Sequence, residues 1–219
     1  GLSGPDCEYI SQIGFVGMGT NPSSSSQDSK IWIGNNGPNT FTFSNQASVD
    51  VILVLWDNGA GDASSFVTAN APKLTYSMPR GSSTTVSLAN NVTGAWSAIY
   101  GHTTTLAWWG QISNTWGEFT TGQSATVDIT RIVNMNGNRF TATVGGEGIN
   151  YGSTGGCQAD HDRCVYVCKT GDTCWKSGTY NLIGCSNQPN NNARLVAGAD
   201  PSGGCTGWDN GGHIDATFL

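Results

Sequence analysis

Short apolar runs separated by clusters of Gly, Asn, Pro and Ser follow one another along most of the chain, and no stretch shows long helical periodicity. Such punctuated runs predict an all-β protein. Residues 49–56, VDVILVLW, are almost continuously apolar, which predicts a central strand covered on both faces. The number and spacing of the runs predict a β-sandwich or a flattened barrel.

Two turn sequences suggest how these strands connect. The predicted strands are residues 31–33, 40–43, 49–56, 74–78, 84–88, 96–100, 106–109, 117–121, 125–133, 139–144 and 214–219. Pro79-Arg80-Gly81 predicts a hairpin between 74–78 and 84–88, and Asn136-Gly137 predicts another between 125–133 and 139–144. Trp108 and Trp109 are consecutive on a predicted strand, so their side chains are expected on opposite faces.

The composition changes near Gly145, after which Gly, Asn and Cys dominate and apolar pieces become short. This change divides the chain into four parts. They are an N-terminal extension packed on the core (1–38), a β-sandwich core (39–145), a cysteine-rich loop lobe (146–213) and a C-terminal strand that returns to the core (214–219).

Charge and composition exclude several classes of function. The 219 residues contain 9 Lys and Arg against 15 Asp and Glu, a formal charge of −6. A nucleic-acid-binding protein or a polybasic membrane anchor needs a basic surface that this chain lacks. No apolar run approaches the ~18 residues of a membrane-spanning helix. The hydrophobic content of 37% includes 8 Trp, 7 Phe and 6 Tyr, which disfavours disorder and leaves one folded unit with a substantial core.

The cysteines predict disulfides and therefore an oxidising compartment. Six of the seven are expected to pair, and we expect Cys7 to reach the late cluster, with Cys205 as the suggested partner. The seven are Cys7, Cys157, Cys164, Cys168, Cys174, Cys185 and Cys205. The alternative is a zinc site near His161, although the spacing departs from the usual C-x2-C pairs. A start at Gly1 suits a mature secreted form, and Asn91 begins a glycosylation sequon.

The segment 115–130, TWGEFTTGQSATVDIT, resembles a core signature of thaumatin-like proteins and the related laminaripentaose-producing β-1,3-glucanases. The resemblance covers roughly residues 39–145 and is at its most specific around Glu118 and Asp128. It implies a thaumatin-like β-sandwich with a disulfide-stapled lobe and an acidic cleft. It departs from the family where Gln111 replaces an Arg and where Gln123 replaces an Asp. A third acid from the lobe does not align, and the candidates are Asp160, Asp162 and Asp200.

Two carboxyl groups facing one groove suit glycoside hydrolysis, which needs one protonated and one ionised carboxyl group. If Glu118 lies nearer an apolar wall of Trp108, Trp109 and Trp116, burial raises its pKa and makes it the acid, with Asp128 as the base. Three alternatives stay open: a sugar-binding cleft without catalysis, an ion pair of Asp128 with Arg131, and plain surface charge. The expected substrate-binding residues are Trp109, Trp116, Gln111, Gln123, Arg131, Asp160 and Asp162, although core packing is an alternative for each Trp.

These observations predict a secreted, monomeric protein of fungal type that recognises β-1,3-glucan in a cell wall, with hydrolysis as a further option. No cofactor and no metal are expected. A non-catalytic secreted effector, defence or cell-wall protein is the first alternative. A glycosidase inhibitor is the second, since residues 186–204 are long enough to form a protruding loop that binds a foreign protein.

Overall fold

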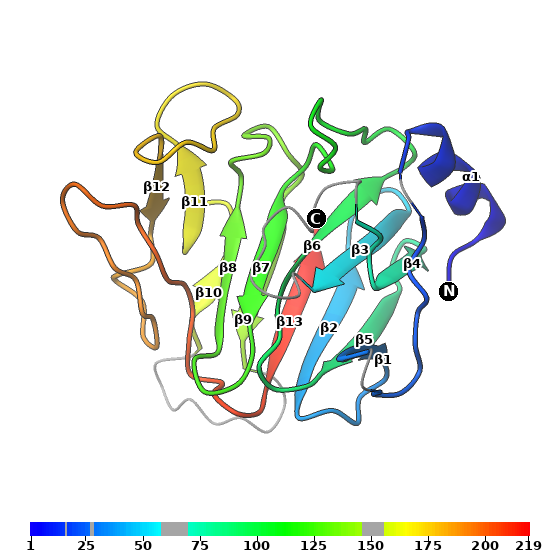
Figure 1. The fold of residues 1–219 in the computed structure, drawn as a ribbon, viewed down its shortest axis with the longest axis horizontal. Coiled ribbons are helices and arrows are strands. Elements are labelled where there is room, and N and C mark those ends of the chain that lie inside the picture. Colours follow the sequence, from blue (N-terminus) through cyan, green and yellow to red (C-terminus); the bar gives the residue numbers. More distant parts are fainter. Residues whose placement is uncertain (16, 27–28, 58–69, 146–155) are drawn as a thin grey trace.

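The computed structural model describes residues 1–15, 17–26, 29–57, 70–145 and 156–219. Within these ranges, thirteen strands form two mixed sheets, and one helix lies near the N-terminus (Figure 1). The predicted all-β, thaumatin-like fold with disulfides in the cysteine-rich part is confirmed. The lobe predicted over 146–213 begins with residues 146–155, which lie outside the described ranges.

The six-stranded sheet is completed by the last strand of the chain. Its spatial order is β1 (Ile31–Ile33), β5 (Ser83–Leu88), β2 (Asn39–Asn45), β13 (Gly212–Phe218), β9 (Phe140–Val144) and β10 (Gln158–Ala159). β13 pairs in parallel with β2 and antiparallel with β9. The sheet therefore closes only when the C-terminal segment is in place, as Figure 1 shows.

The seven-stranded sheet carries the candidate site. Its spatial order is β12 (Tyr180–Ile183), β11 (Val165–Cys168), β8 (Thr126–Thr130), β7 (Trp116–Thr120), β6 (Thr93–Tyr100), β3 (Val51–Asp57) and β4 (Leu74–Met78). The continuously apolar β3 pairs with β4 and β6 and is buried on both faces, as its sequence predicts.

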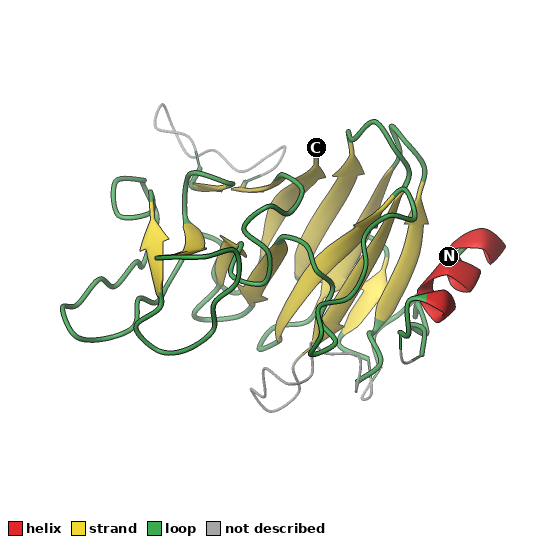
Figure 2. Cartoon of the chain, turned by 90° about the horizontal axis from the view of Figure 1, so that it is seen from above, coloured by secondary structure: helices red, strands yellow, loops and turns green. Residues whose placement is uncertain are grey.

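Alternation along β3 separates two hydrophobic clusters. Leu53 and its alternate neighbours face the main core between the two sheets. Ile52, Val54 and Trp56 face a second cluster on the outer side of the seven-stranded sheet. Helix α1 (Gly4–Gln12) covers part of that outer side, where its residue Ile10 is fully buried. Helix α1 lies at the opposite end of the molecule from the lobe (Figure 2). The sequence analysis did not predict this helix.

Both predicted hairpins are wrong. β4 belongs to the seven-stranded sheet and β5 to the six-stranded sheet, so Pro79-Arg80-Gly81 turns the chain from one sheet to the other. β8 and β9 are separated in the same way. Gly137 is needed for another reason: a Cβ there would lie 2.5 Å from the backbone nitrogen of Thr115, so the loop is docked against a neighbouring segment.

The strand predicted over residues 106–109 is also wrong. These residues form a turn with a single bridge between Leu106 and Ile112. Trp108 and Trp109 therefore do not point to opposite faces of a strand, and their rings instead meet edge to face with centroids 5.3 Å apart.

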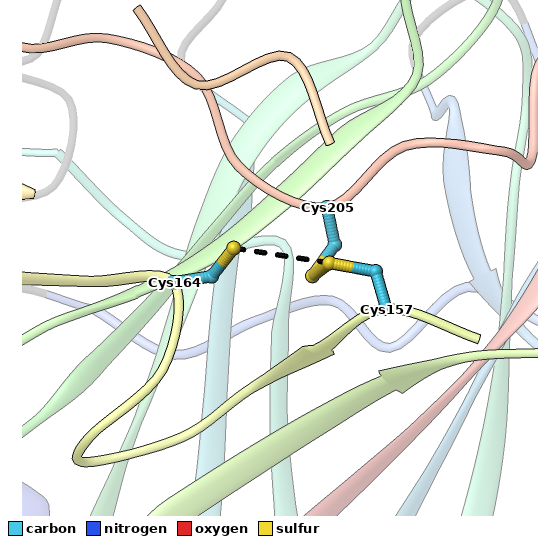
Figure 3. Close-up of side chains that lie close together, drawn as sticks. All are labelled: Cys157, Cys164 and Cys205. Carbon is cyan, nitrogen blue, oxygen red and sulfur yellow. Dashed lines mark hydrogen bonds between the residues drawn. A yellow bond between two sulfur atoms is a disulfide. The ribbon is translucent and has the colours of Figure 1, made fainter. Parts of the chain in front are cut away.

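Three disulfides join cysteines within the lobe: Cys157–Cys205, Cys164–Cys185 and Cys168–Cys174. The expected link between Cys7 and Cys205 is wrong, because Cys7 is exposed and unpaired on α1 while Cys205 bonds Cys157. The first two disulfides are in contact, with the sulfur atoms of Cys157 and Cys164 3.8 Å apart (Figure 3). Within each disulfide the two sulfur atoms are bonded to each other and provide no thiolate. These cysteines therefore do not form the zinc site considered as an alternative.

Candidate functional site

Glu118 and Asp128 lie directly opposite each other on β7 and β8. Their neighbours Phe119, Val127 and Ile129 face the core between the sheets. Because successive side chains of a strand point to opposite faces, both carboxyl groups lie on the outer face of the seven-stranded sheet. The sequence prediction that two neighbouring strands hold these acids together agrees with this register.

The two carboxyl groups share a hydrogen bond, which requires one proton between them. Burial raises the pKa of both groups. The charge of Glu118 and the shared hydrogen bond raise the pKa of Asp128 further, whereas the same hydrogen bond lowers that of Glu118. Both carboxyl groups therefore hold a proton to a higher pH than free carboxyl groups do, and the rise in pKa is marked for Asp128. The assignment of Glu118 as the acid and Asp128 as the base stays a prediction.

The carboxyl pair has no cationic partner within the described residues. Arg131, the expected partner of Asp128, instead donates to the backbone carbonyls of His161 and Met135. No other described group donates a hydrogen bond to Oδ1 of Asp128, which is buried. The pair is thus buried without a cationic partner among the described residues.

The cysteine-rich lobe adds polar groups beside the pair. Tyr166 on β11 donates to the carbonyl of Gly203 at 2.9 Å, and its ring packs edge to face on Tyr180. Burial first, and then the neighbouring acids Asp128 and Glu118, raises the pKa of Tyr166. Tyr166 is therefore a neutral phenol next to the acids.

Asp200 is the lobe acid that contacts Tyr180, the ring partner of Tyr166. It hydrogen-bonds Tyr180, whose pKa is raised by burial, by Asp200 and by Glu118. Hydrogen bonds from the N–H of Gly178 and from Ser177 lower the pKa of Asp200 itself, so it is ionised. Of the three candidates for a third acid, Asp200 is the one that shares a neighbour, Tyr180, with Glu118.

A groove of about 460 Å³ opens over Glu118. It is walled mainly by indole rings and apolar side chains, and its lining residues are Trp108, Trp109, Gln111, Trp116, Glu118, Thr130, Ile132, Val133, Cys174 and Trp175. Its volume falls in the range of about 300–1,000 Å³ that is usual for small-ligand pockets. The walls come from the loops that follow β6 and β11, which lie at the same end of the sheet (Figure 1).

The four tryptophans of the groove are held differently. Trp108 is 89% exposed and Trp175 is 67% exposed. Trp109 is half-buried and donates from its ring nitrogen to Oε1 of Gln111 at 2.8 Å. Trp116 is buried and donates to the carbonyl of Ile112, so it supports the groove from below.

Trp175 is a site residue that the sequence analysis missed. It lies in the loop between β11 and β12, among Thr, Lys, Ser and Gly, where no packing partner is evident. A single exposed Trp is not a signal by itself; Trp175 becomes informative because it shares a groove with Trp108, which the sequence positions do not show.

The remaining sequence candidates lie outside the groove lining. Asp160 forms an ion pair with Arg163 at 2.6 Å. Burial alone would raise the pKa of Asp160, but the hydrogen bonds from Arg163 outweigh it and lower the pKa. Asp162 is exposed and pairs with Arg139. Gln123 is exposed in the turn between β7 and β8.

His161, the candidate ligand of the zinc alternative, is part of the packing. Its Nε2 lies 2.9 Å from the carbonyl of Asn138 and 3.2 Å from the hydroxyl of Thr115. The side chain is buried, and burial lowers its pKa, which favours the neutral imidazole.

The two-sheet core and the disulfide-linked lobe define a protein of thaumatin-like type. A family model described as the Allergen Asp f 4-like domain matches residues 35–198, about three quarters of the chain. The chain therefore belongs to this family, which is a thaumatin-like family. Among curated proteins, no sequence matches this chain significantly. Within the described residues, no helix has the length and apolar character that crossing a membrane requires.

Proposed function

We propose that this protein is secreted and recognises a cell-wall glycan, β-1,3-glucan first, through the groove over Glu118. The disulfides of the lobe and the thaumatin-like family support secretion. The observation that carries the proposal is the pair of exposed indoles, Trp108 and Trp175, on one groove with a carboxylate. Aromatic faces pack on the C–H groups of pyranose rings, while Glu118, Gln111 and Thr130 offer hydrogen bonds to the hydroxyls.

The spacing of the acids favours binding over hydrolysis. Glycosidases hold their two carboxyl groups about 5–5.5 Å apart when they retain configuration and about 6.5–9.5 Å apart when they invert it. Glu118 and Asp128 share a direct hydrogen bond, so a scissile bond has no room between them. Recognition without turnover therefore fits this geometry better than a glucanase mechanism.

Binding to laminari-oligosaccharides, measured by titration calorimetry beside reducing-sugar release from laminarin, tests the proposal. We expect binding without sugar release. Trp175→Ala and Trp108→Ala should each weaken binding about tenfold, which corresponds to about 1.4 kcal/mol. Both variants should keep the melting temperature, because both side chains are exposed.

Leu195→Ala is the matched control, since Leu195 is an exposed apolar residue that does not line the groove. Sugar release that Glu118→Gln abolishes would replace the binding role with an enzymatic one. No binding and no release would contradict the proposal and favour the effector or inhibitor alternatives, for which the exposed Leu195 and Val196 offer a contact surface.

A further inference from the structure

The groove holds a carboxyl group that a neutral glucan would leave without a cationic partner. The carboxyl group of Glu118 lines the groove, shares a hydrogen bond with Asp128 and forms no ion pair within the described residues. None of the groove-lining residues is a lysine, an arginine or a histidine. A carboxylate in an apolar surrounding is costly unless a cation or several hydrogen-bond donors compensate it.

The walls of the groove suit a cation. An ammonium group over the face of an indole gains about 0.5–1 kcal/mol at exposed sites and about 2 kcal/mol when desolvated. Four indoles line the groove together with Glu118, and two of them are well exposed. The Trp175 ring already holds one ammonium group of the protein, since Nζ of Lys176 lies 5.4 Å from its centroid. Lys176 is not a lining residue, so its own charge does not compensate Glu118 within the groove.

We propose that the groove prefers a glycan with a free amino group, such as a glucosamine oligomer, and holds the ammonium group between the indoles and Glu118. The inference rests on the proposed function, because it assumes that the groove binds sugar rings. It adds that the charge of the sugar, and not only its ring faces, determines selectivity. Glu118 would accept hydrogen bonds from the ammonium group, and Asp128 would act as a positioning residue through its hydrogen bond to Glu118.

Three short oligomers of equal length test this preference: a glucosamine trimer, its fully N-acetylated form and a laminari-trisaccharide. Titration calorimetry at a pH at which the amine is protonated should give at least tenfold tighter binding for the glucosamine trimer than for its acetylated form. Glu118→Gln should weaken binding of the glucosamine trimer about tenfold and change binding of the neutral trimers less than twofold. Near-ultraviolet circular dichroism of the variant checks that its fold is intact.

Asp209→Asn separates a specific site from general attraction to an acidic protein, because Asp209 is exposed and does not line the groove. This variant should bind all three trimers as the unchanged protein does. Equal weakening of glucosamine binding by Asp209→Asn and Glu118→Gln would overturn the inference. Binding of the neutral trimers at least as tight as that of the glucosamine trimer would also overturn it and would leave the glycan-binding function standing. Absence of binding to all three would overturn the proposed function as well.

Discussion

Asp128 is buried opposite a second carboxyl group, and the fold tolerates this arrangement by keeping a proton on it. The pKa of Asp128 is raised well above its ordinary value of 3.8 by burial and by Glu118. Above pH 3.8 the unfolded chain loses this proton while the folded protein still holds it. The contribution of Asp128 to stability is therefore greatest below its unfolded pKa and decreases as the pH rises through the folded pKa.

Asp128→Asn should remove this pH dependence. Asparagine has a similar shape and donates a hydrogen bond to Glu118 without titrating. We expect the variant to be more stable than the unchanged protein at pH 7, by about 1 kcal/mol or more, with the difference shrinking towards pH 4. Thermal unfolding followed by circular dichroism across this range measures the effect. Melting curves that stay parallel at every pH would show that Asp128 does not carry the proton.

The position of Glu118 on the groove could be predicted because strand alternation and the TWGEFTTG signature determine its face. The raised pKa of Asp128 could not be predicted. It depends on the direct contact with Asp128 and on the absence of an ion pair with Arg131 in the described structure, and sequence spacing contains neither.

At the scale of elements, helix α1 is attached to the sheet by a small polar cluster. Asp6 accepts a hydrogen bond from Ser77 on β4, its backbone N–H donates to Oγ of Ser3, and its Oδ1 lies 2.6 Å from Nε2 of His102. Tyr9 stacks on the His102 ring with centroids 4.7 Å apart. Ser3, Asp6, Ser77 and His102 line a cavity of about 570 Å³ and are already bonded to one another within it. The cluster therefore serves to dock the helix.

Asp6→Asn should loosen this attachment. Burial alone would raise the pKa of Asp6, but the hydrogen bonds from Ser77, His102 and Ser3 outweigh it and lower the pKa. Because its pKa is lowered, the Asp6 carboxylate stabilises the fold at pH values above 3.8, its ordinary pKa. This contribution to stability is lost as the pH falls through the folded pKa. The variant should lose about 1 kcal/mol at pH 7 and little at the acid end.

Hydrogen exchange of the α1 amides together with thermal unfolding measures this loss. Glu8→Gln on the same helix is the control, because Glu8 is exposed and its one side-chain hydrogen bond is to Gln12. Equal effects of the two substitutions would mean that Asp6 does not hold the helix.

Strand positions could be predicted from sequence better than strand pairing. β1 and β4 have the bounds that their apolar runs predict. The strand with which each of them pairs depends on packing against strands that are distant in the sequence. Asn136-Gly137 has the sequence of a tight hairpin, yet Asn134 and Asn138 of this loop hydrogen-bond Ser113 and Asn114, so tertiary contacts override the local signal.

At the scale of the whole molecule, two of the three disulfides have different roles. Cys157–Cys205 links the segment before β10, in the six-stranded sheet, to a segment that bridges Val127 in the seven-stranded sheet. Cys168–Cys174 closes a loop within the lobe, and Cys174 lines the groove beside Trp175. Cys157–Cys205 therefore holds the sheets together, and Cys168–Cys174 shapes the groove.

Removing each disulfide should separate stability from binding. The sequence separations are 48 and 6 residues. Loop entropy alone gives losses of about 4 kcal/mol for Cys157→Ala with Cys205→Ala and about 2 kcal/mol for Cys168→Ala with Cys174→Ala. The second variant should show the greater loss of oligosaccharide affinity, because it frees the loop that carries Trp175. Guanidinium unfolding and calorimetry under conditions where both variants are folded measure the two effects. If the variant lacking Cys157–Cys205 lost more affinity, the wall of the groove would depend on the packing of the sheets and not on its own loop.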